Sequence, residues 1–145
     1  IVKRPFERQP VTQADQQTIR QALERLLEQQ GAPPVARQML LQSLTFAEHY
    51  PAFANLMAGP AGTLWVQHVQ TAADVAVSGT VDLQDLGAPN WDVFDAEGRY
   101  LGVVRFPDRF NPMRFVGNDV YGVWRDELDV QHVMRLRVVG IGTDA

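Results

Sequence analysis

Cysteine is absent from this 145-residue sequence, and lysine occurs once, as Lys3. Without cysteine the chain has no disulfide bond, no thiolate metal ligand and no cysteine nucleophile. The other cationic residues are all arginine. Arginine can be selected for bidentate carboxylate contacts, but codon usage in a GC-rich genome explains the bias more simply.

Long apolar runs and excess positive charge are missing as well. No window approaches the roughly 18 consecutive apolar residues that a membrane-spanning helix needs, so we expect no membrane span in this chain. The formal net charge is −4, whereas nucleic-acid binding depends mainly on clustered Lys and Arg, so we expect no nucleic-acid partner. The hydrophobic share of 46% is that of a globular chain with one real core.

The first third of the sequence has helical periodicity. Thr12 and Asp15 have the spacing of a capping box with Asp in place of the usual Glu, and Gly31 predicts where the helix ends. The apolar residues between them recur on one stripe of a helix. They are Ile19, Ala22, Leu23, Leu26 and Leu27.

A second helix is predicted from Pro34, because proline is favoured at the first helical position. Its apolar residues are expected to face the core rather than a cofactor. They are Val35, Met39, Leu40 and Leu44. The helical part is expected to end at His49-Tyr50-Pro51, since the residue before a proline avoids helical angles.

After Ala52 the apolar period changes from helical to two, which predicts short strands. Short segments rich in Gly, Asn and Asp lie between most of them, which is typical of an antiparallel meander of hairpins. The exception is Gln70 to Pro89, which is too long for a hairpin and predicts an excursion from the sheet. The predicted strands are Phe53 to Ala58, Thr63 to Val69, Trp91 to Asp95, Tyr100 to Phe106, Met113 to Val116, Val120 to Trp124 and His132 to Val138.

Four segments carry a resemblance to a known family: Tyr50-Pro51-Ala52-Phe53, Gly62-Thr63-Leu64-Trp65-Val66, the run from Trp91 to Gly102, and the run from Gly122 to Val130. Together they resemble the C-terminal part of bacterial six-bladed β-propellers related to NHL-repeat proteins. The resemblance extends from Tyr50 to Val139, and the segment from Thr12 to Leu44 is similar to a helical insertion that some members carry between blades. These motifs specify blade geometry and hardly any chemistry.

The resemblance implies a mainly β fold of antiparallel four-stranded blades, one complete and a second lacking its fourth strand, with an N-terminal two-helix insertion. The implied organisation is a linker or end of a strand over 1–11, the insertion over 12–49, the first blade over 50–107, the incomplete blade over 108–139 and a tail over 140–145. A fragment of a ring exposes unpaired strand edges. We therefore expect either a longer native chain or partner chains that pair with those edges.

In such a propeller the polar connections are expected to share the ligand-binding end of the ring. Here they are Gln70 to Pro89, Pro107 to Pro112 and Arg125 to Gln131. We interpret this end as the binding face. The candidate contact residues are Arg109, Asn111, Arg125, Asp126, Glu127 and Asp129.

Catalytic and metal sites are less well supported. Asp126, Glu127 and Asp129 could supply some oxygen ligands to a hard cation, but they lack the spacing of a calcium loop, so a solvated acidic turn beside Arg125 is the simpler interpretation. Neither serine lies in a Gly-x-Ser-x-Gly elbow. No catalytic residue, metal site or cofactor is predicted.

The histidines and tryptophans are read as structural. His49, His68 and His132 lack the spacing of a metal site, and the two in or beside strands are expected to bond to backbone groups. Aromatic rings can stack on ligands when they are exposed, but strand positions between Val and Leu favour burial. We expect this of Trp65, Trp91 and Trp124.

The sequence therefore predicts a non-enzymatic β-propeller module that binds a ligand or a protein. Two alternatives stay open: an accessory or structural subunit of a larger envelope complex, and a metal-dependent propeller hydrolase or lyase, since the resembled family includes lactonases and peptidyl lyases. The expected partners are other protein chains or the rest of a longer propeller chain. The resemblance favours a bacterial protein with a periplasmic or extracellular location.

Overall fold

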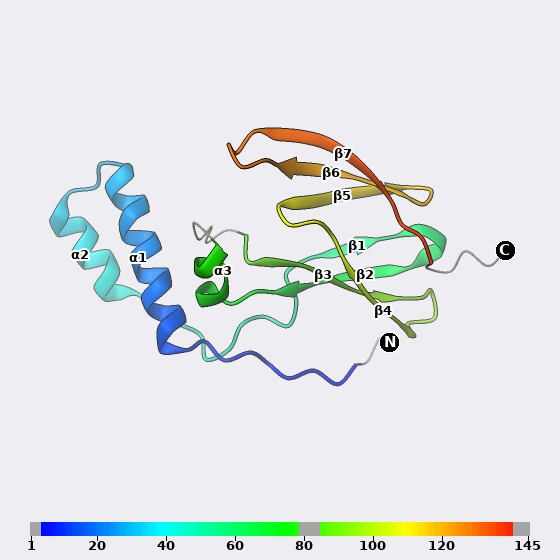
Figure 1. The fold of residues 1–145 in the computed structure, drawn as a ribbon. Coiled ribbons are helices and arrows are strands. Elements are labelled where there is room, and N and C mark those ends of the chain that lie inside the picture. The colour runs from blue at the N-terminus through cyan, green and yellow to red at the C-terminus, as the bar shows by residue number, and fades with distance from the viewer. Residues whose placement is uncertain (1–3, 79–84, 141–145) are drawn as a thin grey trace. The chain divides into compact units, whose positions relative to one another are not determined.

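The computed structural model describes residues 4–78 and 85–140 (Figure 1). Its element order is three helices and seven strands, and the strands form two antiparallel sheets. The chain divides into two compact units. The β unit comprises Ile1–Pro5, Phe53–His68 and Gly87–Ala145, and the helical unit comprises Phe6–Ala52 and Val69–Leu86. The predicted mainly β fold with antiparallel sheets is confirmed at this level.

The first sheet of the β unit has four strands in the order β1-β2-β3-β4. Its bounds are β1 Leu56–Ala58, β2 Leu64–Val69, β3 Gly87–Phe94 and β4 Tyr100–Arg105. The short turn η1 (Pro60–Gly62) joins β1 to β2, with Gly62 at a φ of 75° that glycine adopts without strain.

The second sheet has three strands in the order β5-β6-β7. Their bounds are β5 Phe110–Val116, β6 Asp119–Arg125 and β7 Gln131–Arg137. Gly117, at a φ of 59°, makes the tight turn between β5 and β6. Between the two sheets, β1 lies beside β5 (Figure 1).

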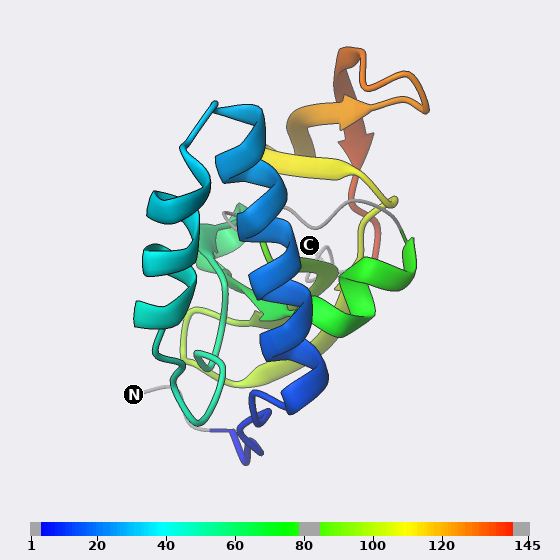
Figure 2. The same cartoon turned by 90° about the vertical axis from the view of Figure 1, so that its left-hand side faces the viewer.

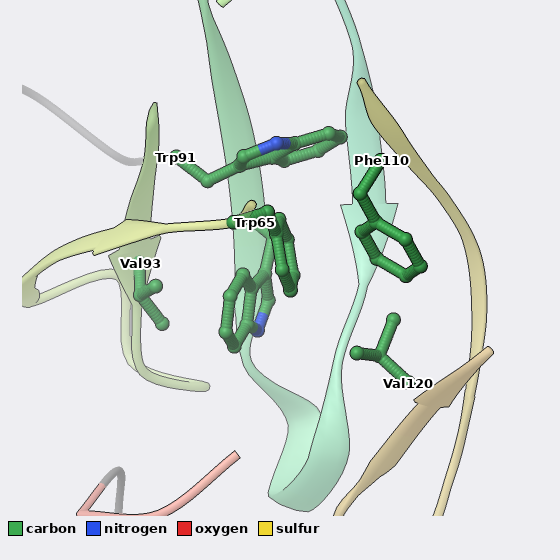
Figure 3. Close-up of a cluster of buried hydrophobic side chains, with 6 residues drawn as sticks. Trp65, Trp91, Val93, Phe110 and Val120 are labelled. Carbon is green, nitrogen blue, oxygen red and sulfur yellow. The ribbon is translucent and has the colours of Figure 1, made fainter. Parts of the chain in front are cut away.

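The core of the β unit lies between the two sheets. Trp65, Trp91 and Phe110 form its centre together with two buried valines (Figure 3). Phe106 lies among these rings, 5.9 Å from Trp65 and 5.4 Å from Phe110 between ring centroids. The predicted burial of Trp65 and Trp91 is therefore confirmed, while Trp124 is half-buried at the margin of this core.

Three strands begin three or more residues from the predicted start, while the other boundaries differ less. β1 begins at Leu56 rather than Phe53, although Ala54 and Asn55 still exchange backbone hydrogen bonds with Gln67. β3 begins at Gly87, four residues before Trp91. Pro89 lacks an N–H, which weakens a strand prediction, but its carbonyl oxygen accepts the N–H of Phe106.

The third difference is β5, which begins at Phe110 rather than Met113. Asn111 and Pro112 therefore lie in a strand and not in the connection where they were predicted. A register shift between Pro112 and Arg114 accommodates the proline in an edge strand.

The helical unit contains α1 (Gln13–Gln29), α2 (Pro34–Ser43) and α3 (Ala72–Ser78), with α2 and α3 both beside α1 (Figure 2). The predicted capping box is present: Asp15 donates its N–H to the Thr12 hydroxyl and accepts the Thr12 N–H at 2.9 Å. Pro34 begins α2 as predicted. The Gln70 to Pro89 excursion supplies α3, which the sequence did not predict, and 79–84 lie outside the described residues.

The predicted core face of α2 is wrong. Val35 and Met39 are 71% and 67% exposed, and Leu40 is exposed as well. Leu41 is half-buried instead, and its carbonyl oxygen accepts a 2.6 Å hydrogen bond from Arg20 of α1. Among the described residues no helix is long and apolar enough to span a membrane.

Candidate functional site

The β6–β7 loop is organised by one side chain, Asp126. Its Oδ1 accepts the N–H groups of Leu128 and Val130, both at 2.9 Å, and its own N–H donates to the Val130 carbonyl oxygen at 3.1 Å. A carboxylate that accepts N–H groups two and four residues onward closes the loop without help from elsewhere in the chain. Asp126 therefore has a structural role in this loop.

The β3–β4 turn has the same construction. Asp95 Oδ1 accepts the N–H groups of Glu97 and Arg99, and Gly98 occupies the left-handed position with a φ of 83°. In the β6–β7 loop that position is held by Asp129, at a φ of 62°. Because the two loops share their backbone geometry, only the side chains around the β6–β7 loop distinguish it as a candidate site.

Three of those side chains, two arginines and one histidine, place a nitrogen against an oxygen of the loop. Arg109, itself at a φ of 63°, donates from its guanidinium to the Asp126 carbonyl oxygen at 2.7 Å. Arg125 contacts both carboxylate oxygens of Asp129 at 3.1 and 3.2 Å. His132 Nε2 lies 3.0 Å from Asp126 Oδ2. We call Arg109, Arg125, Asp126, Asp129 and His132 the loop cluster.

Electrostatics in the loop cluster favour the ionised carboxylate. The hydrogen bond from His132 is the largest cause that lowers the pKa of Asp126, and the N–H groups of Val130 and Leu128 lower it further. His132 also packs on Trp124, with 5.7 Å between ring centroids. The predicted backbone partner of His132 is therefore wrong, since its partner is a carboxylate.

Of the six predicted contact residues, the structure brings four together: Arg109, Arg125, Asp126 and Asp129. Glu127 lies in the same loop and is exposed. Asn111 lies in β5 opposite Val123, outside the loop cluster, because its segment is strand rather than connection. Among the described residues no three His, Asp or Glu side chains are grouped so that they could hold a metal ion.

The other predicted part of the binding face cannot be assigned to the same site. The Gln70 to Pro89 segment belongs largely to the helical unit, and 79–84 lie outside the described residues. The loop cluster is therefore considered by itself. It presents the remaining guanidinium donors of two arginines, with the exposed Glu127 in the same loop, and this arrangement suits polar contacts with a partner.

A second polar cluster surrounds Asp92 of β3, and sequence reasoning missed it. Only 12% of the Asp92 side chain is exposed, and it forms an ion pair with Arg4 near the N-terminus. His68 of β2 places Nε2 3.0 Å from Asp92 Oδ1, at ion-pair distance but outside hydrogen-bond geometry. The Tyr100 hydroxyl donates to the same oxygen at 3.3 Å.

The Asp92 cluster also affects Tyr100. Burial raises the pKa of the Tyr100 phenol first, the Asp92 charge raises it further, and Arg4, stacked 4.3 Å from the ring centroid, opposes the rise. The alternation of Trp91, Asp92 and Val93 was the available signal, since it places Asp92 on the sheet face opposite the core. The residues that meet Asp92 there come from three distant segments, which the sequence does not indicate.

A third feature is the outward face of the three-stranded sheet. Register places Arg114, Tyr121 and Arg135 in one row across β5, β6 and β7, and places Asp119 beside Arg137 in the next. Arg137 Nε donates to Asp119 Oδ1 at 2.9 Å, whereas neither Arg114 nor Arg135 has an ion-pair partner among the described residues. Val133 on the same face is 86% exposed.

Comparison of the chain with family models, with curated proteins and with solved structures found no match.

Proposed function

We propose that the two sheets are neighbouring blades of a six-bladed β-propeller and that the chain acts as a non-enzymatic binding module. The observation that carries this proposal is the arrangement of the β unit. A four-stranded meander is followed directly by a three-stranded one, and the first strands of the two, β1 and β5, lie side by side. Blades that radiate from a common axis approach each other at their innermost strands.

The missing fourth strand of the second sheet is the functional element in this proposal. In the described part of the chain nothing pairs with the outer edge of β7. An open strand edge of seven residues is a template for another strand. The module would therefore bind by accepting a strand, from the rest of a longer chain or from a partner chain.

The loop cluster adds polar contacts at the end of the same sheet. Arg109 and Arg125 are exposed, and each uses only part of its donor capacity on the loop. Glu127 lies exposed in the same loop, whereas Asn111 lies in β5 outside the loop cluster. A periplasmic or extracellular location remains a prediction from the resemblance.

The native mass tests this proposal. Protein purified without proteolysis should be measured by intact mass spectrometry and by light scattering. A particle of about three times the 16.2 kDa of this chain, as one longer chain or as an assembly, is expected from two blades in a ring of six. A monodisperse 16.2 kDa monomer that stays soluble at high concentration would exclude the propeller.

A further inference from the structure

The backbone groups at the outer edge of β7 can be assigned from hydrogen bonds at its two ends. Val138 donates its N–H to Asn118 at 3.0 Å, and Val130 accepts the N–H of Asp126 at 3.1 Å. The β6–β7 register between these bonds is unbroken. Since hydrogen-bonded and non-hydrogen-bonded pairs alternate in an antiparallel ladder, the N–H and C=O groups of Val133, Arg135 and Arg137 point away from β6.

The same alternation separates the side chains of β7 into two sets. Met134, Leu136 and Val138 pack against the core between the sheets. Val133, Arg135 and Arg137 lie on the opposite, outward face, where they pair across the ladder with Val123, Tyr121 and Asp119. A strand added at this edge would meet apolar neighbours on one face and two arginines on the other.

From this edge we infer that β7 accepts an extended segment of a partner chain in which apolar and acidic residues alternate. Its apolar side chains would lie beside Met134 and Leu136 and extend the core. Its carboxylates would lie beside Arg135 and Arg137. This inference rests on the proposed function, because it identifies the partner of the same open sheet, and it adds the chemistry of that partner.

Charge is the reason for an acidic rather than a basic or neutral partner. The chain carries a net charge of −4, yet the outward face has Arg114, Arg135 and Arg137 against one acid, Asp119. Arg135 pairs across the ladder with the uncharged Tyr121. Its charge helps to lower the pKa of Asp119, but among the described residues Asp119 forms its ion pair with Arg137 and Arg135 has none. Opposite charges on adjacent strands stabilise a pair, and like charges destabilise it.

The described residues near the N-terminus already bond to other segments and do not pair with β7. Tyr50 donates its N–H to Gln9 at 2.8 Å, and Val11 donates to Glu48 at 2.9 Å. Arg4 is held by Asp92 of the other sheet. A strand for β7 therefore comes from outside these residues, and the inference commits to a partner chain as its source.

Two synthetic seven-residue peptides test this inference against the 145-residue chain. One alternates Leu or Val with Glu, and the other has Lys at each Glu position. Binding is measured by fluorescence anisotropy at low and high salt. The acidic peptide should bind at least tenfold more tightly than the basic one, and the difference should shrink in high salt because the charges at the edge are exposed.

Chain variants separate backbone pairing from charge. Val133→Pro removes an outward N–H without touching the β6 ladder, so it should abolish binding, while Val133→Ala should retain it. Arg135→Glu should weaken binding of the acidic peptide about fivefold or more and strengthen binding of the basic one. Arg114→Glu makes the same charge change two strands from the edge and should alter binding less than twofold.

The outcomes distinguish the inference from the proposed function. If both peptides bind equally and only Val133→Pro abolishes binding, strand addition stands and the acidic partner is wrong. If neither peptide binds, or if light scattering shows that a second copy of this chain occupies the edge, the partner-chain inference is overturned. Failure of the propeller itself would appear separately, in the native mass.

Discussion

In the β unit the buried residues are mainly tryptophan, phenylalanine and valine, whereas the described part of the helical unit buries only Asp15, Tyr50 and Ala72. The two units thus depend on different interactions. Apolar area holds the two sheets together. In the helical unit a buried carboxylate joins the start of α1 to α3, because Asp15 Oδ1 accepts the Ala73 N–H at 2.9 Å.

Thr12, Asp15 and Tyr50 form a hydrogen-bonded polar centre in the helical unit. Asp15 also accepts the Thr12 hydroxyl at 2.7 Å, and the Tyr50 hydroxyl accepts the Ala72 N–H at 2.9 Å. Such a centre favours one arrangement of α1 and α3 in a unit with little buried apolar area, because any other arrangement would leave a buried polar group without a hydrogen bond. The helical unit should therefore lose stability in acid, and the β unit should lose it when apolar volume is removed from its core.

The largest expected effect is on the β unit. Trp91→Ala should lower the free energy of unfolding by about 3–5 kcal/mol, because a buried aromatic is lost and a cavity remains. Tryptophan fluorescence of the remaining Trp65 and Trp124 during urea unfolding reports this unit. Trp91→Phe is the matched control and should lower the free energy of unfolding much less. It keeps an aromatic ring at this position, and the buried indole N–H that it removes has no partner among the described residues. Equal costs for both variants would contradict the apolar account.

The next effect is on the helical unit. Asp15→Asn should cost roughly 1–3 kcal/mol, because the amide cannot replace every bond that the carboxylate accepts. Far-ultraviolet circular dichroism at the helix minimum follows this unit, which contains no tryptophan. Glu24→Gln, on an exposed position of α1, is the control and should be neutral. If Asp15→Asn were also neutral, the polar centre would not be what orders α1 and α3.

The pH dependence of the helical unit follows from the same residue. Burial by itself raises the pKa of Asp15, but the bonds from Ala73, Thr12 and Tyr50 lower it below the ordinary value of 3.8. A carboxylate with a lowered folded pKa contributes stability above its unfolded pKa and loses it as pH falls through the folded one. The helical signal should therefore weaken below about pH 4, and this weakening should be smaller in Asp15→Asn.

A smaller effect is expected at the Asp92 cluster, where polar residues of the β unit meet. Asp92→Asn removes the charge that helps to raise the pKa of Tyr100, so the Tyr100 pKa should move back toward 10.0. Ultraviolet titration of the phenolate, with Tyr100→Phe to identify the signal, measures it. An unchanged Tyr100 titration would mean that burial alone sets its pKa.

The smallest effect is confined to the β6–β7 loop. Asp126→Asn should speed amide hydrogen exchange at Leu128 and Val130, whose N–H groups the carboxylate accepts, and leave the core unchanged. The pKa of Asp126 is lowered mainly by His132, so the wild-type loop should loosen only in acid, as Asp126 is protonated. Glu127→Gln in the same loop should leave exchange unaltered.

Much of the fold could be read from local patterns. The capping box at Thr12, the helix start at Pro34 and the hairpin turns at Gly98 and Gly117 each depend on neighbours within a few residues, and each was predicted. The errors came where a neighbour far along the chain decides. Pro89 lies in a strand, and Phe106 of a later segment donates to its carbonyl oxygen. Val35 of α2 was predicted to be buried and is exposed, since helical period alone does not say which face of a helix meets its neighbours.

Periodicity and turn chemistry act over short distances, and they were enough to predict α1, α2, the seven strands in their order and the acidic loop, but not α3. Tertiary packing alone brings Arg109 to the Asp126 loop and brings Arg4, His68 and Tyr100 together at Asp92. It also leaves Arg135 without an ion pair among the described residues. Contacts between distant segments depend on strand register and on which face is buried, and neither is written in local sequence.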